Sequence, residues 1–243
     1  MSLLRSEWIK LWSIRTTWTM LGIGLLIEGL FAGLFVGLVP LDDIGSIDEI
    51  ATGTGLLLTL VLVLGVLVTT SEFRYGTASS TFLAAPTRYP VLAAKLGLAL
   101  AAGVLAGLAF TVVNAGLALP IFDSRTGSLP STDNLVSIYA GVTVSMALIC
   151  AFGVGIGAIV RNQVAAIIAA IAFFFILSAL PEFLPGDFAD YFPAQAIGSL
   201  QGLSADTEDG GLGQVAGGFV LSAWVAALMA LGTALICRRD VTD

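Results

Sequence analysis

Six long apolar runs follow one another along the chain and are separated by more polar segments. They cover residues 17–39, 53–70, 91–121, 136–160, 164–180 and 215–237. A helix needs about 20 mostly apolar residues to cross a bilayer. Helices are favoured over strands because the runs are continuous rather than alternating, and a sheet edge in lipid would leave backbone polar groups unsatisfied. The pattern predicts an all-α membrane protein with six transmembrane helices in a single domain, residues 1–243.

The basic residues of the chain fall almost entirely on one side of these spans. If the N-terminus lies inside, all Lys and Arg residues except Arg125 are cytoplasmic, namely Arg5, Lys10, Arg15, Arg74, Arg88, Lys95, Arg161, Arg238 and Arg239. Positive charge is enriched in cytoplasmic loops. We therefore expect a multi-pass protein of the plasma (inner) membrane with both termini in the cytoplasm.

The composition supports the membrane assignment and excludes several kinds of chemistry. Hydrophobic residues make up 57% of the chain and charged residues 11%, which is outside the usual range of soluble domains. No basic patch is available to bind nucleic acid. The chain has no histidine, and Cys150 and Cys237 are far apart in sequence, so we expect neither a zinc site nor a disulfide framework.

The sequence contains no motif of an enzyme that works alone. There is no GxxxxGK[ST] loop to hold phosphates, no GxSxG and no HExxH. The acidic pair Asp42 and Asp43 lies in a polar external turn without an apolar pocket that would tune it for acid–base catalysis. We therefore expect a chain that is not catalytic by itself and does not hydrolyse ATP.

Before the first span, residues 2–15 have the periodicity of an amphipathic helix. Leu4, Trp8, Leu11 and Trp12 recur at the spacing of one helix face. Trp is favoured at the membrane–water interface, so we expect this helix to lie in the inner headgroup layer. It is either a simple anchor for the first span or a mechanical element beside a partner protein.

A polar interruption at residues 71–95, SEFRYGTASSTFLAAPTRYPVLAAK, separates the second and third spans. Phe73, Tyr75 and Phe82 are aromatic side chains among charged residues, a composition suited to filling a groove on another protein. Gly76 permits a turn, after which a short helix can follow. The alternative is an ordinary cytoplasmic hairpin whose basic residues only follow the charge bias of membrane proteins.

Two motifs in this interruption resemble the first cytoplasmic loop of ABC type 2 permeases, the membrane subunits of type V ABC exporters. They are E-x-R-x-G-T at residues 72–77 and T-F-L-x-x-P-x-R at residues 81–88. The whole chain is similar in arrangement, with a short second cytoplasmic hairpin at residues 161–163 and a longer last external loop. The resemblance implies a coupling helix that contacts a separate ATPase subunit through Glu72, Phe73, Arg74, Tyr75, Gly76 and Thr77, with Pro86 and Arg88 shaping its exit.

The same resemblance implies partners and a mechanism. Two copies of an ABC ATPase subunit are expected to bind ATP and Mg, whereas this chain is expected to bind no cofactor. A second permease copy is expected to complete the translocation path for a hydrophobic or amphipathic substrate such as a drug, lipid or peptide. In this family the last external loop holds a re-entrant pair of short helices, which corresponds here to residues 181–214.

Two polar residues lie deep in the predicted spans. Glu28 is near the middle of the first span, where an unpaired charge is expensive. It either lines a translocation path or subunit interface, or it is a neutral carboxyl bonded to a nearby Thr or backbone carbonyl. Asn114 in the third span is a second candidate for the path or interface, although a single amide more often forms an interhelical hydrogen bond.

Glycines with a spacing of four residues predict close helix packing. In the first span they are Gly29, Gly33 and Gly37, which can pack within one chain or between two copies. Because Gly is frequent in membrane spans, we treat two further pairs of this spacing as background, Gly103/Gly107 and Gly213/Gly217.

Two other functions fit the sequence less completely. An ion-coupled secondary carrier needs ionisable groups and broken helices near the midplane, and Glu28 is one such group. A non-transporting membrane scaffold or immunity protein needs neither feature. Co-purification distinguishes the three functions. A stoichiometric ATPase partner favours the exporter, and an active chain without a partner favours the carrier. A different soluble partner favours the scaffold.

Overall fold

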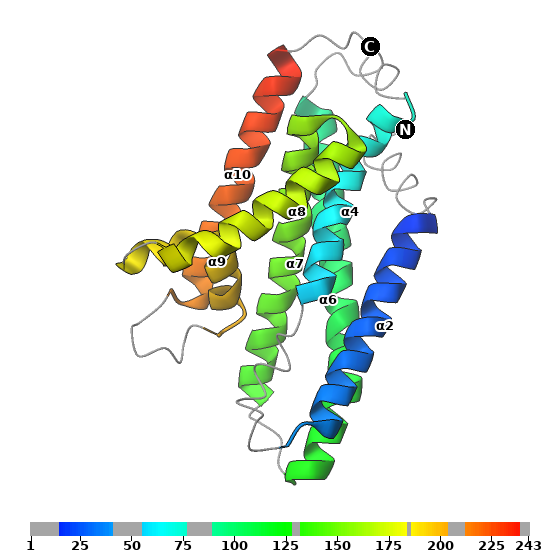
Figure 1. Ribbon diagram of the computed structural model, residues 1–243, viewed down its shortest axis with the longest axis vertical. Coiled ribbons are helices and arrows are strands. Elements are labelled where there is room, and N and C mark those ends of the chain that lie inside the picture. Colours follow the sequence, from blue (N-terminus) through cyan, green and yellow to red (C-terminus); the bar gives the residue numbers. More distant parts are fainter. Residues whose placement is uncertain are drawn as a thin grey trace.

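The computed structural model describes residues 15–40, 55–76, 89–127, 132–183, 186–203 and 212–238, and every regular element in these ranges is helical. In chain order (Figure 1) the elements are α2 (Arg15–Leu38), α4 (Gly55–Arg74), α6 (Tyr89–Thr126), α7 (Thr132–Val160), α8 (Gln163–Ala179), η2 (Leu180–Phe183), η3 (Gly186–Tyr191), α9 (Pro193–Leu200) and α10 (Gln214–Arg238). The chain is thus all-helical throughout its described part.

Among the described residues, five helices are long and apolar enough to cross a membrane, namely α2, α4, α6, α7 and α10. They coincide with five of the six predicted runs. The remaining run corresponds to α8, which has 17 residues and is the shortest of the set. The prediction of an all-α protein with several apolar helices suited to a membrane is confirmed at this level.

Several predicted features lie outside the described residues. These are residues 2–14 of the interfacial helix, which include Trp8, Leu11 and Trp12, the loop residues Thr77, Pro86 and Arg88, and residues 204–211 of the last external segment. The described part of that segment forms η2, η3 and α9. Helix α9 packs against α7 and α10, and the indole Nε1 of Trp224 on α10 donates to the carbonyl of Tyr191 at 2.9 Å.

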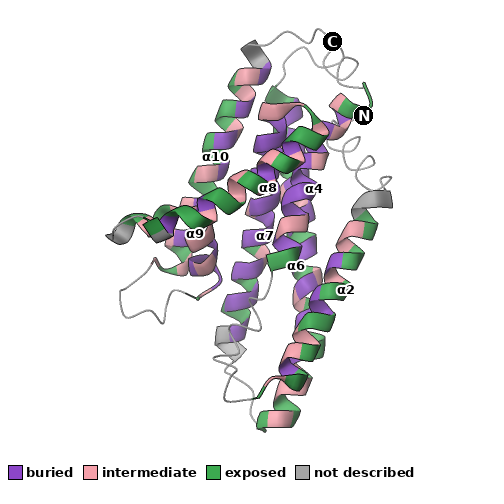
Figure 2. Ribbon diagram, in the orientation of Figure 1, coloured by how far each residue is buried: buried purple, intermediate pink, exposed green. Residues whose placement is uncertain are grey.

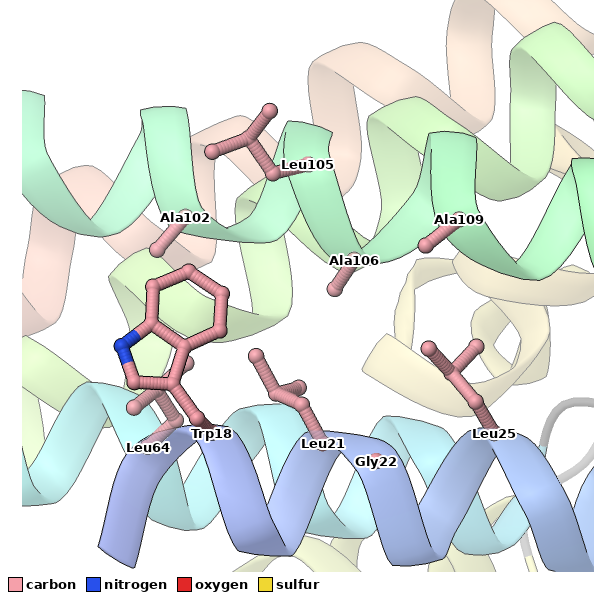
Figure 3. Close-up of a pocket in the computed structure, with 9 residues that line it drawn as sticks. All are labelled: Trp18, Leu21, Gly22, Leu25, Leu64, Ala102, Leu105, Ala106 and Ala109. Atoms are coloured by element: carbon pink, nitrogen blue, oxygen red, sulfur yellow. The ribbon is translucent and has the colours of Figure 1, made fainter. Parts of the chain in front are cut away.

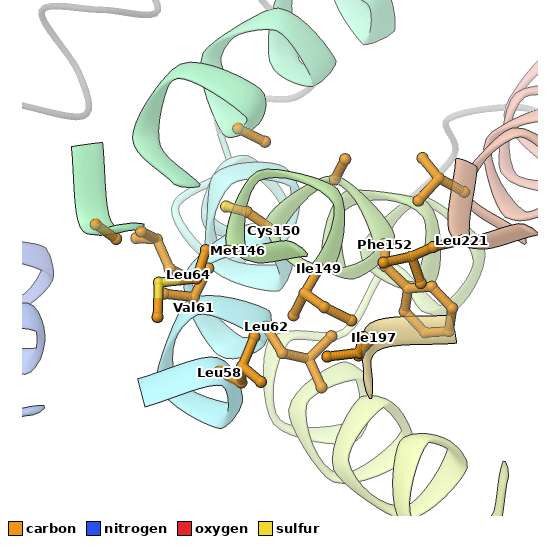
Figure 4. Close-up of a cluster of buried hydrophobic side chains, with 14 of the residues drawn as sticks. Leu58, Val61, Leu62, Leu64, Met146, Ile149, Cys150, Phe152, Ile197 and Leu221 are labelled. Atoms are coloured by element: carbon orange, nitrogen blue, oxygen red, sulfur yellow. The ribbon is translucent and has the colours of Figure 1, made fainter. Parts of the chain in front are cut away.

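Helix α7 is the centre of the bundle. It packs against α4, α6 and α10, and it is the most buried of the five long helices, as the burial colours of Figure 2 show. Its side chains Met146, Ile149 and Phe152 form the main apolar core together with Leu62 of α4 (Figure 4). Helix α2 lies at the edge and exposes one apolar face.

Glycines allow α4 and α6 to approach the backbone of α7. A Cβ atom at Gly65 would lie 1.9 Å from the carbonyl oxygen of Cys150. On α6, a Cβ atom at Gly103 would lie 2.5 Å from the carbonyl oxygen of Met146, and one at Gly107 would lie 2.6 Å from the Cα atom of Thr143. The pair Gly103/Gly107, treated above as background, is therefore a true packing surface, and that part of the interpretation is wrong.

The glycine row of α2 makes looser contacts. A Cβ atom at Gly29 would meet the Val113 side chain of α6 at 2.8 Å, and one at Gly33 would meet Ile121 at 3.8 Å. A Cβ atom at Gly37 would have no other atom within 4 Å. Within the chain, only the first of these three positions lies tightly against a neighbouring helix.

Most of the described basic residues lie toward one end of the bundle. Helix α2 begins toward this end with Arg15, α4 ends there with Arg74, and α10 ends there with Arg238, while α6 begins and α7 ends toward the same end (Figure 1). We call this the basic end. At the opposite end Arg125 donates hydrogen bonds to the carbonyls of Val36 and Val39, the latter at 2.8 Å. The guanidinium thus satisfies carbonyls at the C-terminus of α2, where a positive charge is stabilised by the helix dipole.

Candidate functional site

The candidate site begins with the last turn of α4. Residues 71–74, predicted as the start of a loop, continue the helix, and Tyr75 N–H donates to the carbonyl of Ser71 at 3.0 Å. Gly76 follows with φ of 67°, the left-handed conformation in which a glycine commonly ends a helix. Arg74 is exposed and Tyr75 is 69% exposed, so this end of α4 presents an aromatic and a cationic side chain at the surface.

The turn between α7 and α8 lies beside it. Arg161 is the described non-glycine residue with a left-handed φ, 57°, and it reverses the chain direction after α7. Asn162 caps α8, since its Oδ1 accepts from the Ala165 N–H at 3.0 Å. The Arg161 guanidinium donates to the carbonyl of Leu235 near the end of α10 at 3.3 Å. This turn is therefore fastened to a third helix.

The two segments are in contact although they are far apart in sequence. Arg74 Nη1 donates to Gln163 Oε1 at 3.4 Å, and the Arg161 guanidinium carbon lies 5.9 Å from the centre of the Phe73 ring. Between them is a hollow of about 440 Å³, which we call the polar hollow. Its lining consists of Phe73, Arg74, Arg161, Asn162, Gln163, Val164 and Ile167. The sequence predicted both hairpins separately but not this contact.

Glu72 points away from this surface. Its Oε1 lies 3.2 Å from Lys95 Nζ of α6, and the two side chains are only 5% and 3% exposed. Lys95 Nζ also donates to the carbonyl of Val68 at 3.0 Å. Both residues were predicted to belong to a cytoplasmic loop, and both instead lie within helices, where they connect α4 to α6. Among the described contact residues, Phe73, Arg74, Tyr75 and Gly76 remain at the surface or the polar hollow.

Glu28, the acidic residue in the middle of α2, accepts a hydrogen bond from the first turn of α4. Its side chain is buried, and its Oε1 accepts a hydrogen bond from the Leu57 N–H at 3.0 Å. Leu57 lies in the first turn of α4, where backbone N–H groups have no partner within the helix. The partner is thus a backbone N–H rather than the Thr hydroxyl or carbonyl suggested by the sequence, and a carboxylate is favourable at this positive end of the helix dipole.

Glu28→Ala is expected to lower the free energy of unfolding by about 1–2 kcal/mol, the usual loss when an N-terminal helix cap is removed. Glu28→Gln keeps an acceptor oxygen at the same position, so it is expected to retain most of that stability. Unfolding in mixed micelles with increasing dodecyl sulfate, followed by circular dichroism, measures both. Equal stability of Glu28→Ala and the wild type would contradict the capping role.

Asn114, the other polar residue predicted deep in a span, joins two helices. Its Oδ1 accepts from the hydroxyl of Tyr139 on α7 at 2.8 Å, and both side chains are buried. This is the interhelical hydrogen bond that the sequence named as the more common role of a single amide. Tyr139 was not recognised as the partner, because nothing in the sequence places these two residues at the same depth.

The described side chains at the basic end form a surface with a composition typical of protein interfaces. Arg and Tyr are enriched at the centres of protein interfaces, and the Arg74 guanidinium carbon lies 5.6 Å from the Tyr75 ring centre, so the two present one combined face.

In comparisons with known proteins, no family model matches the chain and no curated protein matches it significantly.

Proposed function

We propose that this chain is the membrane-spanning permease subunit of an ATP-driven exporter, coupled at its basic end to a separate ATPase subunit. The observation that carries the proposal is the contact between Arg74 at the end of α4 and Gln163 in the α7–α8 turn. A partner seated on this surface presses on two separate segments at once. The motifs at residues 72–77 and 81–88 favour an ABC ATPase as that partner.

The contacts around the polar hollow support a mechanical role. The pair of Glu72 and Lys95 fastens the end of α4 to α6, and Arg161 fastens the α7–α8 turn to α10. Coupling between distant sites is carried by such continuous packed and hydrogen-bonded networks. A displacement at the basic end therefore reaches α4, α6, α7 and α10 together.

The remaining parts of the proposal follow from charge and apolarity. The basic end lies on the cytoplasmic side of a plasma (inner) membrane, because basic residues are retained on that side. Helix α8 also crosses the membrane, as the fifth of six spans. Two ATPase subunits carry ATP and Mg, and a second permease copy completes the path. The substrate is hydrophobic or amphipathic, since the described helices offer few polar groups. Glu28 accepts a hydrogen bond from the Leu57 N–H, and this contact weakens the case for an ion-coupled carrier.

Arg74→Ala is expected to weaken ATPase binding about thirtyfold, or ~2 kcal/mol, the loss typical of a central interface residue. The tagged chain is purified from its native membrane after mild cross-linking. The co-purified ATPase is identified by its phosphate-binding loop, and its affinity for wild-type and variant chains is then measured in nanodiscs.

Gln163→Ala is the companion variant. It removes the partner that orients Arg74 but leaves the guanidinium exposed, so it is expected to weaken ATPase binding less than Arg74→Ala does. The proposal fails if no ATPase accompanies the wild-type chain, or if the ATPase binds the Arg74→Ala variant as tightly as the wild type.

A further inference from the structure

A second hollow lies between α2, α4 and α6, away from the polar hollow. Its volume is about 190 Å³. Figure 3 shows Trp18, Leu21 and Leu25 on the α2 side, facing Ala102 and Ala106 of α6. We call it the apolar hollow.

The apolar hollow exists because small residues leave space where α2 diverges from the bundle. Further along α2, Glu28 bonds to Leu57 of α4, and a Cβ atom at Gly29 would touch Val113 of α6 at 2.8 Å, so the helices are close there. Toward the basic end, a Cβ atom at Gly22 would have no other atom within 4 Å, and three of the four lining residues on α6 are alanines, with Leu105 as the fourth. No described side chain of the protein fills the gap.

The chemistry of the lining defines what fits. All of its side chains are hydrocarbon except for the Trp18 indole, and Trp18 is 37% exposed at the edge of the hollow. An apolar cavity of about 150 Å³ stays dry and accepts apolar guests. A hollow that opens on the lipid-facing side of a membrane protein has hydrocarbon chains as its neighbours, so an acyl chain is the fitting occupant.

The position of the apolar hollow along α2 indicates from which membrane leaflet a lipid chain would enter it. Trp18 is three residues from Arg15, the first residue of α2 at the basic end, which is about 4.5 Å along the helix axis. Trp side chains favour the headgroup level of a bilayer. A phospholipid whose headgroup lies at the level of Arg15 can therefore extend a chain past Trp18 toward Leu25.

We propose that the apolar hollow binds one acyl chain of a membrane phospholipid from the leaflet at the basic end. The chain fills the space between α2 and its neighbours α4 and α6, and it completes their packing. This site is independent of the ATPase partner, and it holds whether or not the protein transports a substrate.

The test uses the full chain reconstituted in vesicles of phosphatidylethanolamine and phosphatidylglycerol, in which part of the phosphatidylglycerol carries a diazirine in one acyl chain. After photolysis, mass spectrometry of peptides is expected to find adducts at Leu21, Leu25 and Ala106. Gly22→Leu places a side chain in the hollow and is expected to abolish these adducts. Ala106→Leu fills the hollow from the opposite wall and is expected to do the same.

Gly37→Leu is the matched control, because Gly37 lies on the same helix and also has open space at its Cβ position. It is expected to leave adducts in the hollow unchanged. Adducts at Phe31, which faces outward at 67% exposure, are expected in every variant and confirm that the helix is folded. Labelling restricted to outward faces, or unaffected by both filling variants, would overturn the proposal. Labelling of the hollow by a free diazirine fatty acid but not by the phospholipid would also overturn it, and would assign the hollow to a diffusible apolar ligand.

Discussion

Lys95→Met is expected to lower the free energy of unfolding by about 3–5 kcal/mol, the usual loss when one partner of a buried ion pair is removed. Glu72 would keep its carboxylate at a site that is only 5% exposed, without the ammonium 3.2 Å away. Unfolding in dodecyl sulfate micelles followed by circular dichroism gives the free energy.

Two further variants make this expectation specific. The double variant Glu72→Met/Lys95→Met replaces both charges with apolar groups and is expected to recover most of the lost stability, as observed when buried pairs are replaced together. Arg74→Met removes a charge two residues away at an exposed position, so it is expected to change stability by less than about 1 kcal/mol. A Lys95→Met variant as stable as Arg74→Met would show that the pair does not hold α4 to α6.

The double variant also tests how Glu72 contributes to ATPase binding. If Glu72 acts only by holding α4 against α6, the stable double variant is expected to bind the ATPase normally. If the double variant is stable but does not bind, Glu72 contacts the partner directly, as its place in the E-x-R-x-G-T motif suggested. Arg74→Ala is expected to impair ATPase binding without a comparable loss of stability. Comparison of the two variants therefore distinguishes a residue that stabilises the α4–α6 packing from one that contacts the ATPase.

The helices of this protein could be predicted because long apolar runs have few alternatives in a membrane. The boundary at residue 71 was wrong because Glu72 and Arg74 looked like loop residues. A charged pair can continue a helix when its partner lies on the neighbouring helix, and that requires knowledge of the pairing between α4 and α6.

The partners of polar groups within the spans were harder to predict. Glu28 bonds to a backbone N–H, and a backbone partner leaves no trace in side-chain patterns. The contact of Arg74 with Gln163 depends on how α4 and α8 are placed around α7, which residue spacing along either helix does not specify. The sequence therefore identified individual candidate residues at the basic end, but only the structure shows that they form one surface.

Glycine spacing in the sequence was a poor predictor of where two helices pack closely, for a related reason. Gly29, Gly33 and Gly37 have the more regular pattern, yet the closest approaches involve Gly65 on α4 and two glycines of α7, Gly141 and Gly153. A repeat of four residues places glycines on one helix face, but it does not say whether a neighbouring backbone covers that face. Helix α7 is covered on several sides, so single glycines facing it matter more than a regular row on α2.

Gly65→Ala is accordingly expected to destabilise the protein by about 3 kcal/mol or more, at the upper end of the effect of overpacking a core. The added methyl group would lie 1.9 Å from the carbonyl oxygen of Cys150, and a backbone atom within α7 cannot move aside without displacing the helix. Separation of α4 from α7 would loosen the core around Leu62 and Ile149. The free energy of unfolding in dodecyl sulfate micelles and the yield of monodisperse protein measure the effect.

Gly97→Ala on α6 provides the matched comparison. A Cβ atom at Gly97 would have no other atom within 4 Å, and Ala is favoured over Gly inside a helix by about 1 kcal/mol. This variant is therefore expected to be as stable as the wild type or slightly more stable. Since the two substitutions are chemically identical, a difference between them reports the contact of α4 with α7 alone, and equal stability of both variants would show that these helices are not in direct backbone contact.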